Sequence, residues 1–301
     1  MSIKIPFNRN FDVPYGVIET IEPGIRRITA NNPGPFTFRG TGTYILGYGR
    51  VAVIDPGPDL SEHVDALIRG LGSESISHIL VTHTHNDHSP AAKELKAKTS
   101  APTYGFGPHG SGKIKKEEQV EAGGDMDFIP DEIVKDGSII EGDDWAVSCL
   151  HTPGHTSNHI CFSWDSRKIL FPGDQVMGWS TSIVSPPDGD MGDYMRSLEK
   201  MLLRNDDIYY PAHGPEIRDP KQMVRDFITH RREREDKILA CLQSGGKTVE
   251  EMVPEVYSDI SQELFAAAAR SLFATVIYLV EQGKIISSDG MTINSHYQIR
   301  V

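Results

Sequence analysis

The sequence predicts an α/β fold followed by a smaller C-terminal domain of helices and a β-hairpin. Residues 1–106 alternate short apolar runs of β type with helical segments, and residues 145–216 resume the β-type pattern. After Pro220 the pattern changes to long amphipathic helices. The length allows one large and one smaller domain, and we place them at residues 1–221 and 222–301.

The composition is that of an ordinary globular protein, with 38% hydrophobic and 24% charged residues among 301. The formal net charge of −12 weighs against strong non-specific binding to a polyanion, because such binding depends on Lys and Arg. We expect no membrane association, because no apolar stretch is expected to reach about 18 residues. The N-terminus lacks the apolar core of a secretory signal, and three cysteines make no disulfide framework. A cytoplasmic enzyme is therefore expected.

The N-terminal domain contains three expected helices and one polar segment. The helices lie at about residues 59–70, 87–98 and 190–204, and Pro90 is tolerated in the first turn of the second. Residues 107–131 are polar and rich in glycine, which is typical of a surface insertion. We expect this insertion to lie near the mouth of the candidate active site described below.

The C-terminal residues predict three helices and a β-ribbon. A long amphipathic helix follows Pro220, Thr248 is placed to cap a short helix, and an apolar helix ends near Gly283. Asp289–Gly290 then predicts a hairpin. This is the element order of a winged-helix domain. Residues 222–301 contain nine Lys and Arg against eleven Asp and Glu. Because nucleic-acid-binding domains are usually basic, a role in packing or homodimer formation is favoured over nucleic-acid binding.

The segment VTHTHNDHSPAA, residues 81–92, concentrates three histidines and an aspartate at a strand-to-helix turn. In α/β folds the active crevice lies at the carboxyl ends of strands. Imidazole suits zinc and other first-row metals, and a carboxylate adds negative charge. Four candidate ligands, namely His83, His85, Asp87 and His88, exceed what one open tetrahedral site takes from one segment. Two neighbouring metal ions are therefore predicted.

Three later segments also place a candidate ligand after a β-type run. They are HTPGHTSNH at residues 151–159, KILFPGDQV at 168–176 and IYYPAHGP at 208–215. An earlier run, VAVIDPGPD, ends in Asp55 and a Gly-Pro turn. Every candidate ligand therefore lies at a strand end, where a shared site can form.

Together these five segments resemble the metallo-β-lactamase family, in the family's order and over roughly residues 15–220. The resemblance implies an αββα sandwich and a dinuclear hydrolytic site. It assigns His83, His85 and His155 to the first metal, and Asp87, His88 and His213 to the second. Asp174 is implied to bridge the two ions. Zinc is the expected metal, with manganese or iron as alternatives, because all ligands are N or O.

Two residues carry an expected catalytic role. Two adjacent metal ions activate a water molecule for attack, and Asp87 could accept its proton. His159 follows His155 by four residues and could contact an oxyanion or protonate a leaving group. A hydrogen-bonding role behind the ligands is the alternative for His159.

With its winged-helix tail, the chain resembles the β-lactamase-like protein 2 group. That resemblance implies a metal-dependent hydrolase acting as a phosphodiesterase or endoribonuclease on single-stranded RNA. The same ligand set also serves a thioesterase like glyoxalase II, or another carbonyl ester hydrolase. The substrate is accordingly expected to be a small molecule or a single-stranded nucleic acid.

Overall fold

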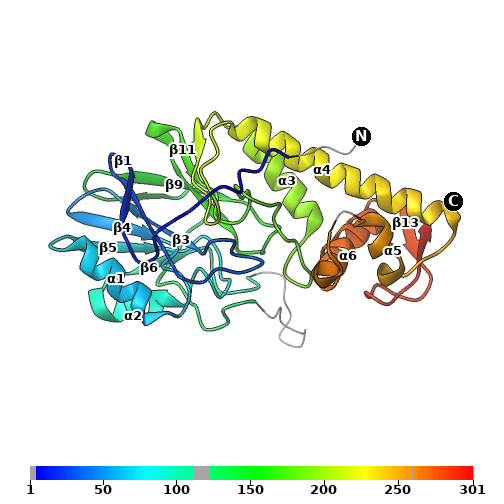
Figure 1. Cartoon of the computed structure of the whole chain (residues 1–301), viewed down its shortest axis with the longest axis horizontal. Helices are drawn as coiled ribbons and strands as arrows, with labels where there is room; N and C mark the ends of the chain where they lie inside the picture. Colours follow the sequence, from blue (N-terminus) through cyan, green and yellow to red (C-terminus); the bar gives the residue numbers. More distant parts are fainter. Residues whose placement is uncertain (1–4, 112–122, 259, 301) are drawn as a thin grey trace.

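The computed structural model describes residues 5–111, 123–258 and 260–300, and it has two β-sheets packed face to face between outer helices (Figure 1). A smaller C-terminal domain lies beside this sandwich. The predicted αββα sandwich is therefore confirmed. Part of the predicted surface insertion, residues 112–122, lies outside the described residues.

The first sheet has seven strands in sequential order. They are β1 (Glu19–Glu22), β2 (Ile25–Thr29), β3 (Gly42–Leu46), β4 (Arg50–Ile54), β5 (Ser75–Leu80), β6 (Thr103–Gly105) and β7 (Glu132–Ile133). Strands β4 to β7 are parallel, so their carboxyl ends share one edge. The helices α1 (Ser61–Leu71) and α2 (Ala91–Thr99) cover its outer face through Leu67 and Leu95.

The second sheet has five strands in the order β12-β11-β10-β9-β8. Their bounds are β8 (Ile139–Glu141), β9 (Ala146–His151), β10 (Ile160–Trp164), β11 (Ile169–Phe171) and β12 (Ile208–Tyr209). A short 3₁₀ turn, η1 (Asp165–Arg167), closes the predicted β10–β11 hairpin. Helices α3 (Met191–Leu202) and α4 (Pro220–Cys241) cover the outer face.

Alternation along the strands explains the layering, because successive side chains point to opposite faces. In β10, Phe162 enters the cluster between the two sheets, whereas Cys161 enters the cluster under α3 and α4. In β4, Ile54 likewise faces the inter-sheet cluster, and Val53 faces α1 and α2. These strands therefore read as continuous apolar runs because both of their faces are covered.

The C-terminal domain contains the end of α4 and the elements that follow it. These are η2 (Leu242–Ser244), α5 (Val249–Val256), η3 (Gln262–Leu264), α6 (Phe265–Glu281), β13 (Ile285–Ser287) and β14 (Tyr297–Ile299). Thr248 caps α5 in a capping box with Glu251, as its position predicted. The hairpin differs from the expected tight turn, because nine residues, 288–296, separate the paired strands.

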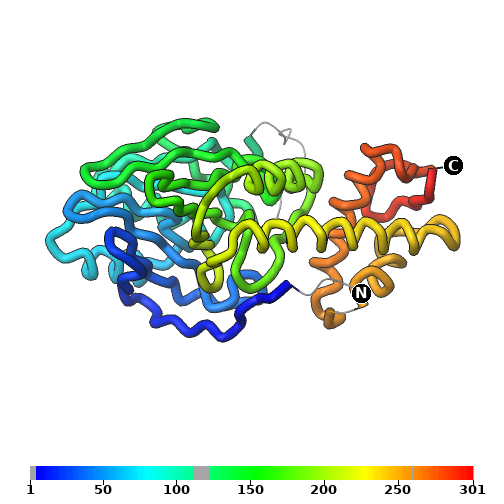
Figure 2. Tube along the Cα trace, turned by 90° about the horizontal axis from the view of Figure 1, so that it is seen from above, coloured from blue at the N-terminus to red at the C-terminus, as the bar shows by residue number. Residues whose placement is uncertain are grey.

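Helix α4 links the two domains physically (Figure 2). Its first half, including Phe227, packs in the core of the sandwich, and its second half, including Ile238, packs in the C-terminal core. Because the helix is continuous from Pro220 to Cys241, it contributes to both cores. The predicted boundary between residues 221 and 222 stays a prediction.

One segment among the described residues is long and apolar enough to cross a membrane by length and composition alone. It is Gln262–Glu281, with a mean hydropathy of 1.6. The expectation that no apolar stretch reaches this length was therefore wrong. In this fold the segment contains the core helix of the C-terminal domain, where Leu272, Val276 and Leu279 are buried. A core helix passes the same test, so the finding is weak evidence for a membrane.

Candidate metal centre

The two sheets bring the predicted ligands together at the ends of their strands. The HTHNDH segment follows β5, and His155, Asp174 and His213 follow β9, β11 and β12. Strands β9 and β11 both run antiparallel to β10, and β12 is parallel to β11. Their carboxyl ends therefore meet at one edge, where all seven side chains gather.

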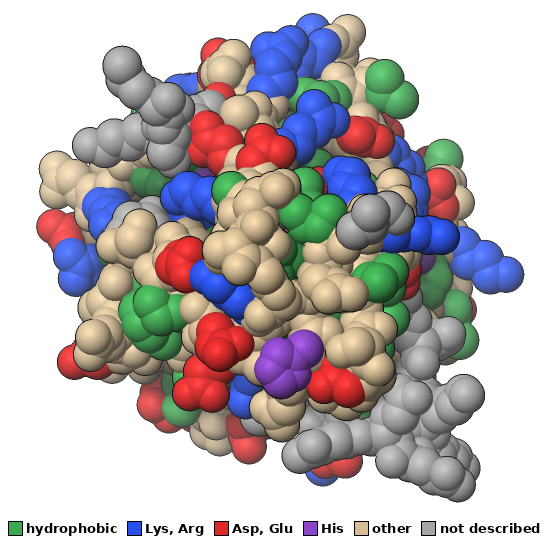
Figure 3. Space-filling model, turned by 90° about the vertical axis from the view of Figure 1, so that its right-hand side faces the viewer, with side chains coloured by type: hydrophobic (Ala, Val, Ile, Leu, Met, Phe, Trp, Pro, Cys, Tyr) green, Lys and Arg blue, Asp and Glu red, His purple; other side chains and the backbone are tan. Residues whose placement is uncertain are grey.

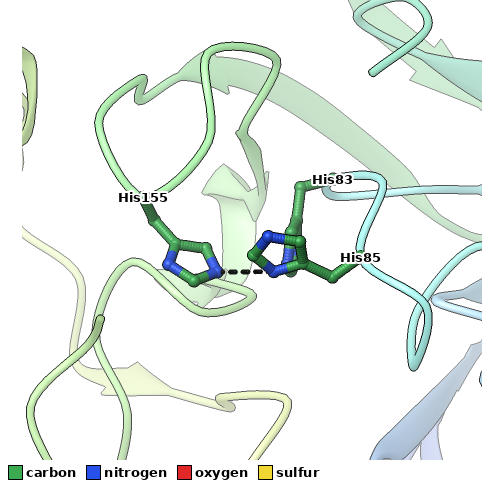
Figure 4. A group of neighbouring side chains, drawn as sticks. All are labelled: His83, His85 and His155. Carbon is green, nitrogen blue, oxygen red and sulfur yellow. Dashed lines mark hydrogen bonds between the residues drawn. The ribbon is translucent and has the colours of Figure 1, made fainter. Parts of the chain in front are cut away.

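The first group consists of His83, His85 and His155. Figure 4 shows the three rings pointing toward one another from two different loops. Nδ1 of His85 lies 3.0 Å from Nε2 of His83 and 3.0 Å from Nε2 of His155. Three imidazole nitrogens so close together form a nitrogen-rich face suited to a first-row cation.

The second group consists of Asp87, His88 and His213. Oδ2 of Asp87 lies 3.2 Å from Nε2 of His88 and 3.1 Å from Nε2 of His213. Thr41 donates its hydroxyl hydrogen to the same oxygen at 3.0 Å, which orients the carboxylate. This group can therefore offer two nitrogens and one oxygen to a second cation.

Asp174 lies between the groups. Its carboxylate oxygens are 3.7 Å from Nε2 of His155, 3.6 Å from Nε2 of His88 and 3.4 Å from Nε2 of His213. It thus contacts one histidine of the first group and two of the second. This is the position that a bridging carboxylate requires, although its role as a ligand stays a prediction.

Hydrogen bonds behind the rings test whether these histidines suit a metal. The Thr82 hydroxyl donates to Asp55 at 2.7 Å, so its oxygen is left to accept from Nδ1 of His83 at 3.0 Å. Nδ1 of His88 lies 3.0 Å from Asp55 and donates to that carboxylate. In both rings the proton therefore resides on Nδ1, and the lone pair of Nε2 faces the cluster.

The rings of His155 and His213 follow the same rule. Nδ1 of His155 donates to the carbonyl oxygen of Ile183 at 2.6 Å, and Nδ1 of His213 donates to that of Gly40 at 3.2 Å. Histidine ligands are typically fixed by such outer hydrogen bonds, which set the tautomer. The residues present therefore fit a metal-binding role.

The electrostatics of the second group agree with this. Burial opposes a charge on His213, but the Asp174 and Asp87 carboxylates outweigh it and raise the pKa of that ring to about 10. Burial also opposes ionisation of Asp87, yet His88 and His213 hold its pKa well below the usual range. The carboxylates create a negative potential at these nitrogens, which a cation would neutralise. Asp87 is ionised at neutral pH, as a ligand must be.

Asp55 has a role that the sequence did not assign. It is buried in a positive-φ conformation after β4, and it accepts from the Thr82 amide at 2.8 Å as well as from the Thr82 hydroxyl and His88. One carboxylate therefore orients one histidine from each metal group. The Asp-Pro-Gly sequence after an apolar strand was the available signal.

The structure supports the hydrogen-bonding alternative for His159. The ring is fully buried, with Nδ1 2.9 Å from the Thr152 hydroxyl. Its Nε2 accepts the backbone N–H of Asp174 at 3.2 Å. Both ring nitrogens are thus engaged within the protein, and His159 positions the loop that carries Asp174.

We expect His159→Ala to keep its metal ions and to lose less activity than the roughly 10²–10⁴-fold that a general acid contributes. The substitution should instead lower the free energy of unfolding by about 1–3 kcal/mol, because the buried backbone N–H of Asp174 is left without its acceptor. Elemental analysis, denaturant unfolding and a pH–rate profile check this. A profile that loses one limb in the variant would show that His159 transfers a proton.

A pocket of about 450 Å³ opens over the cluster. Its walls include His85, Asp87, His155, Asp174 and His213, together with the apolar side chains of Phe36, Met177 and Ile183. Helix α6 of the C-terminal domain adds Ala267 and Arg270. Sequence reasoning missed this contribution, because it treated the tail as a packing, dimerisation or nucleic-acid-binding module.

Comparison with known proteins agrees with the fold and the site. The sequence profile of the metallo-β-lactamase superfamily matches residues 37–213, and that of the β-lactamase associated winged helix domain matches residues 248–292. The chain therefore belongs to the metallo-β-lactamase superfamily, and it is a metal-dependent hydrolase. Its two-domain arrangement is that of the β-lactamase-like protein 2 group, as the sequence predicted.

Individual relatives cover most of the chain. The β-lactamase-like protein 2 homolog of Caenorhabditis elegans is 31% identical over 93% of this chain and 90% of that protein. An atrochrysone carboxyl ACP thioesterase of Claviceps purpurea (strain 20.1) is 32% identical over 82% of this chain and 76% of that protein. The crystal structure of a β-lactamase domain protein from Burkholderia ambifaria superposes with a TM-score of 0.81 at 16% identity, covering 98% and 97% of the two chains. At that identity it shows the fold alone.

Proposed function

We propose that this protein is a dinuclear metal-dependent thioesterase. The observation that carries the proposal is the combination of seven N and O donors with an adjoining apolar wall of Phe36, Met177 and Ile183. An apolar wall beside a hydrolytic centre suits an acyl group better than a run of phosphates. The similarity to a protein named as an ACP thioesterase supports the same substrate class.

Single-stranded RNA, the first expectation from the resemblance, receives less support from the surface. Sequence-tolerant binding of single strands uses a positively charged groove that follows the backbone over several nucleotides, with stacking aromatics along it. Figure 3 shows Lys and Arg side chains interspersed with Asp and Glu over the face on the C-terminal side. With a formal net charge of −12, this favours the thioesterase over the nuclease.

The roles of the residues follow from their positions. His83, His85 and His155 would hold one ion, Asp87, His88 and His213 the other, and Asp174 would contact both. When bound, the ions supply Lewis acidity toward the thioester carbonyl and lower the pKa of water. Asp55, Thr82 and the carbonyls of Ile183 and Gly40 hold four of these five rings, all but that of His85, in the required tautomer. Asp87 is ionised, and its role as acceptor of the proton of the attacking water is part of the proposal.

We expect about two metal ions per chain, with zinc first and manganese or iron compatible with the same donors. Elemental analysis of protein purified without chelator, and again after zinc supplementation, measures this. Removal of the metal should abolish hydrolysis, and its return should restore it. A fully active protein without transition metal would contradict the proposal.

Substrate class is tested by parallel assays on one preparation. We expect hydrolysis of an acyl thioester such as S-lactoylglutathione or an acyl-pantetheine, with little turnover of a bis-ester phosphate or of single-stranded RNA. Cleavage of RNA with no thioester turnover would favour the endoribonuclease instead.

A further inference from the structure

A second cavity, of about 570 Å³, adjoins the catalytic pocket. It lies at the junction of the N-terminal segment, helix α4 and helix α6. Phe36, Ile183 and Ala267 line both spaces. A ligand that extends past these three side chains would therefore reach from one space into the other.

The second cavity is basic. Arg9, Arg231 and Arg234 line it, and the described residues around it include no Asp or Glu. Ser and Thr hydroxyls, including those of Ser180 and Thr181, add further hydrogen-bonding groups. The chain as a whole has 42 acidic against 30 basic residues, so this concentration of positive charge differs from the rest of the molecule.

Arg231 is the deepest of these cations, with only 4% of the residue exposed. It donates to the carbonyl oxygen of Ser182, and its guanidinium lies 5.0 Å from the centre of the Tyr194 ring. Its Nε has no hydrogen-bond partner in the part of the chain that the structure describes, and no carboxylate there pairs with it. A buried charge without a counter-ion is costly unless a ligand supplies the opposite charge.

Arg9 adds an exposed guanidinium to the same cavity. It forms no ion pair within residues 5–111, 123–258 and 260–300, so its donors are available to a ligand. Guanidinium groups bind phosphate with two parallel hydrogen bonds, which gives both affinity and orientation. Two such groups, in a space whose described lining residues include no carboxylate, are suited to a phosphate.

We propose that this second cavity binds a phosphate at the far end of the substrate's thiol arm, with Arg9 and Arg231 as the binding residues. This rests on the proposed thioesterase function. The thioester would lie at the metal centre, and the arm would pass between Phe36 and Ala267 toward the arginines. The substrate class is then an acyl thioester of a phosphorylated thiol, of the phosphopantetheine type.

Binding calorimetry on the metal-loaded protein tests this with two probes that differ by one phosphate. They are S-methyl-phosphopantetheine and S-methyl-pantetheine, whose thioethers resist hydrolysis. We expect the phosphorylated probe to bind at least about tenfold more tightly, which corresponds to roughly 1.4 kcal/mol. Arg9→Gln should remove most of this difference, and Arg9→Lys should retain part of it. Arg9 is chosen over Arg231 because Arg9 is exposed, whereas Arg231 is buried and donates to the carbonyl oxygen of Ser182.

Arg50→Gln is the matched control. It removes the same charge from an exposed arginine at the start of β4, about 16 Å along the strand from Asp55. This variant should bind both probes as the wild type does. Equal binding of the probes by the wild type, or equal effects of Arg9→Gln and Arg50→Gln, would overturn the phosphate site.

The two proposals fail in different ways. If the protein hydrolyses thioesters but does not distinguish the probes, the phosphate site is wrong and the thioesterase stands. If the phosphorylated probe binds tightly through Arg9 but no thioester is hydrolysed, the thioesterase is wrong. If a short single-stranded oligonucleotide binds with the same dependence on Arg9 and the phosphorylated probe does not, the second cavity does not bind the thiol arm, and that proposal is overturned.

Discussion

Asp174→Asn is expected to lose at least one metal ion and nearly all hydrolysis. The carboxylate lies within 3.4–3.7 Å of three ring nitrogens drawn from both groups. Asparagine preserves the size of the side chain but removes the negative charge that offsets repulsion between two cations. Metal affinity should therefore fall by more than the roughly 10–100-fold that follows the loss of an outer hydrogen-bond partner. Elemental analysis and steady-state kinetics measure the two effects.

Asp207→Asn is the matched control for this substitution. Its side chain is 71% exposed and lies 3.7 Å from Lys168, so the same chemical change should leave metal content and rate unaltered. If Asp174→Asn kept two ions and normal turnover, Asp174 would not contact both ions.

Asp55→Asn is expected to weaken both the fold and the metal centre without removing a ligand. Asp55 accepts three hydrogen bonds, from the Thr82 amide, the Thr82 hydroxyl and His88. An amide group can accept at only one of the two oxygen positions, so at least one buried donor loses its partner. We expect a loss of about 1–3 kcal/mol in the free energy of unfolding of the metal-free protein. Metal affinity should fall roughly 10–100-fold, because His83 and His88 lose their orientation.

Denaturant unfolding and metal titration measure these two losses separately. Asp59→Asn, an exposed position in the loop that follows β4, serves as the control and should change neither. Unchanged metal affinity in Asp55→Asn, with the stability loss present, would show that Asp55 supports only the fold.

The metal centre could be predicted from sequence because its geometry is local to strand ends. His83, His85, Asp87 and His88 occupy one turn, and each remaining candidate follows a β-type run. Once those strands pair in two parallel sets, their carboxyl ends must share an edge. No detailed contact was needed to expect that these side chains would meet.

The hydrogen bonds behind the ligands could not be predicted in the same way. The role of Asp55 depends on the direction of the Thr82 hydroxyl and on a positive φ at Asp55 itself. The carbonyls of Ile183 and Gly40 carry no side-chain signal at all. For His159, spacing alone did not distinguish a proton donor from a residue that holds the Asp174 loop.

Contacts between the two domains could not be predicted from the sequence either. Arg270 reaches the catalytic pocket because α6 packs against α3 and α4 and lies across the pocket from Phe36 and Thr37. The hairpin lies where Asp289–Gly290 indicated, but its loop is longer than a tight turn. Tyr297 pairs with Ser287 and also bridges to Lys247, which sets a register that the local Asp289–Gly290 signal does not contain.

The most direct test of the central claim is anomalous diffraction from crystals of the metal-loaded protein. We expect two peaks, one among His83, His85 and His155 and one among Asp87, His88 and His213, with Asp174 adjoining both. A single peak, or peaks away from these side chains, in protein that hydrolyses its substrate would contradict the dinuclear site.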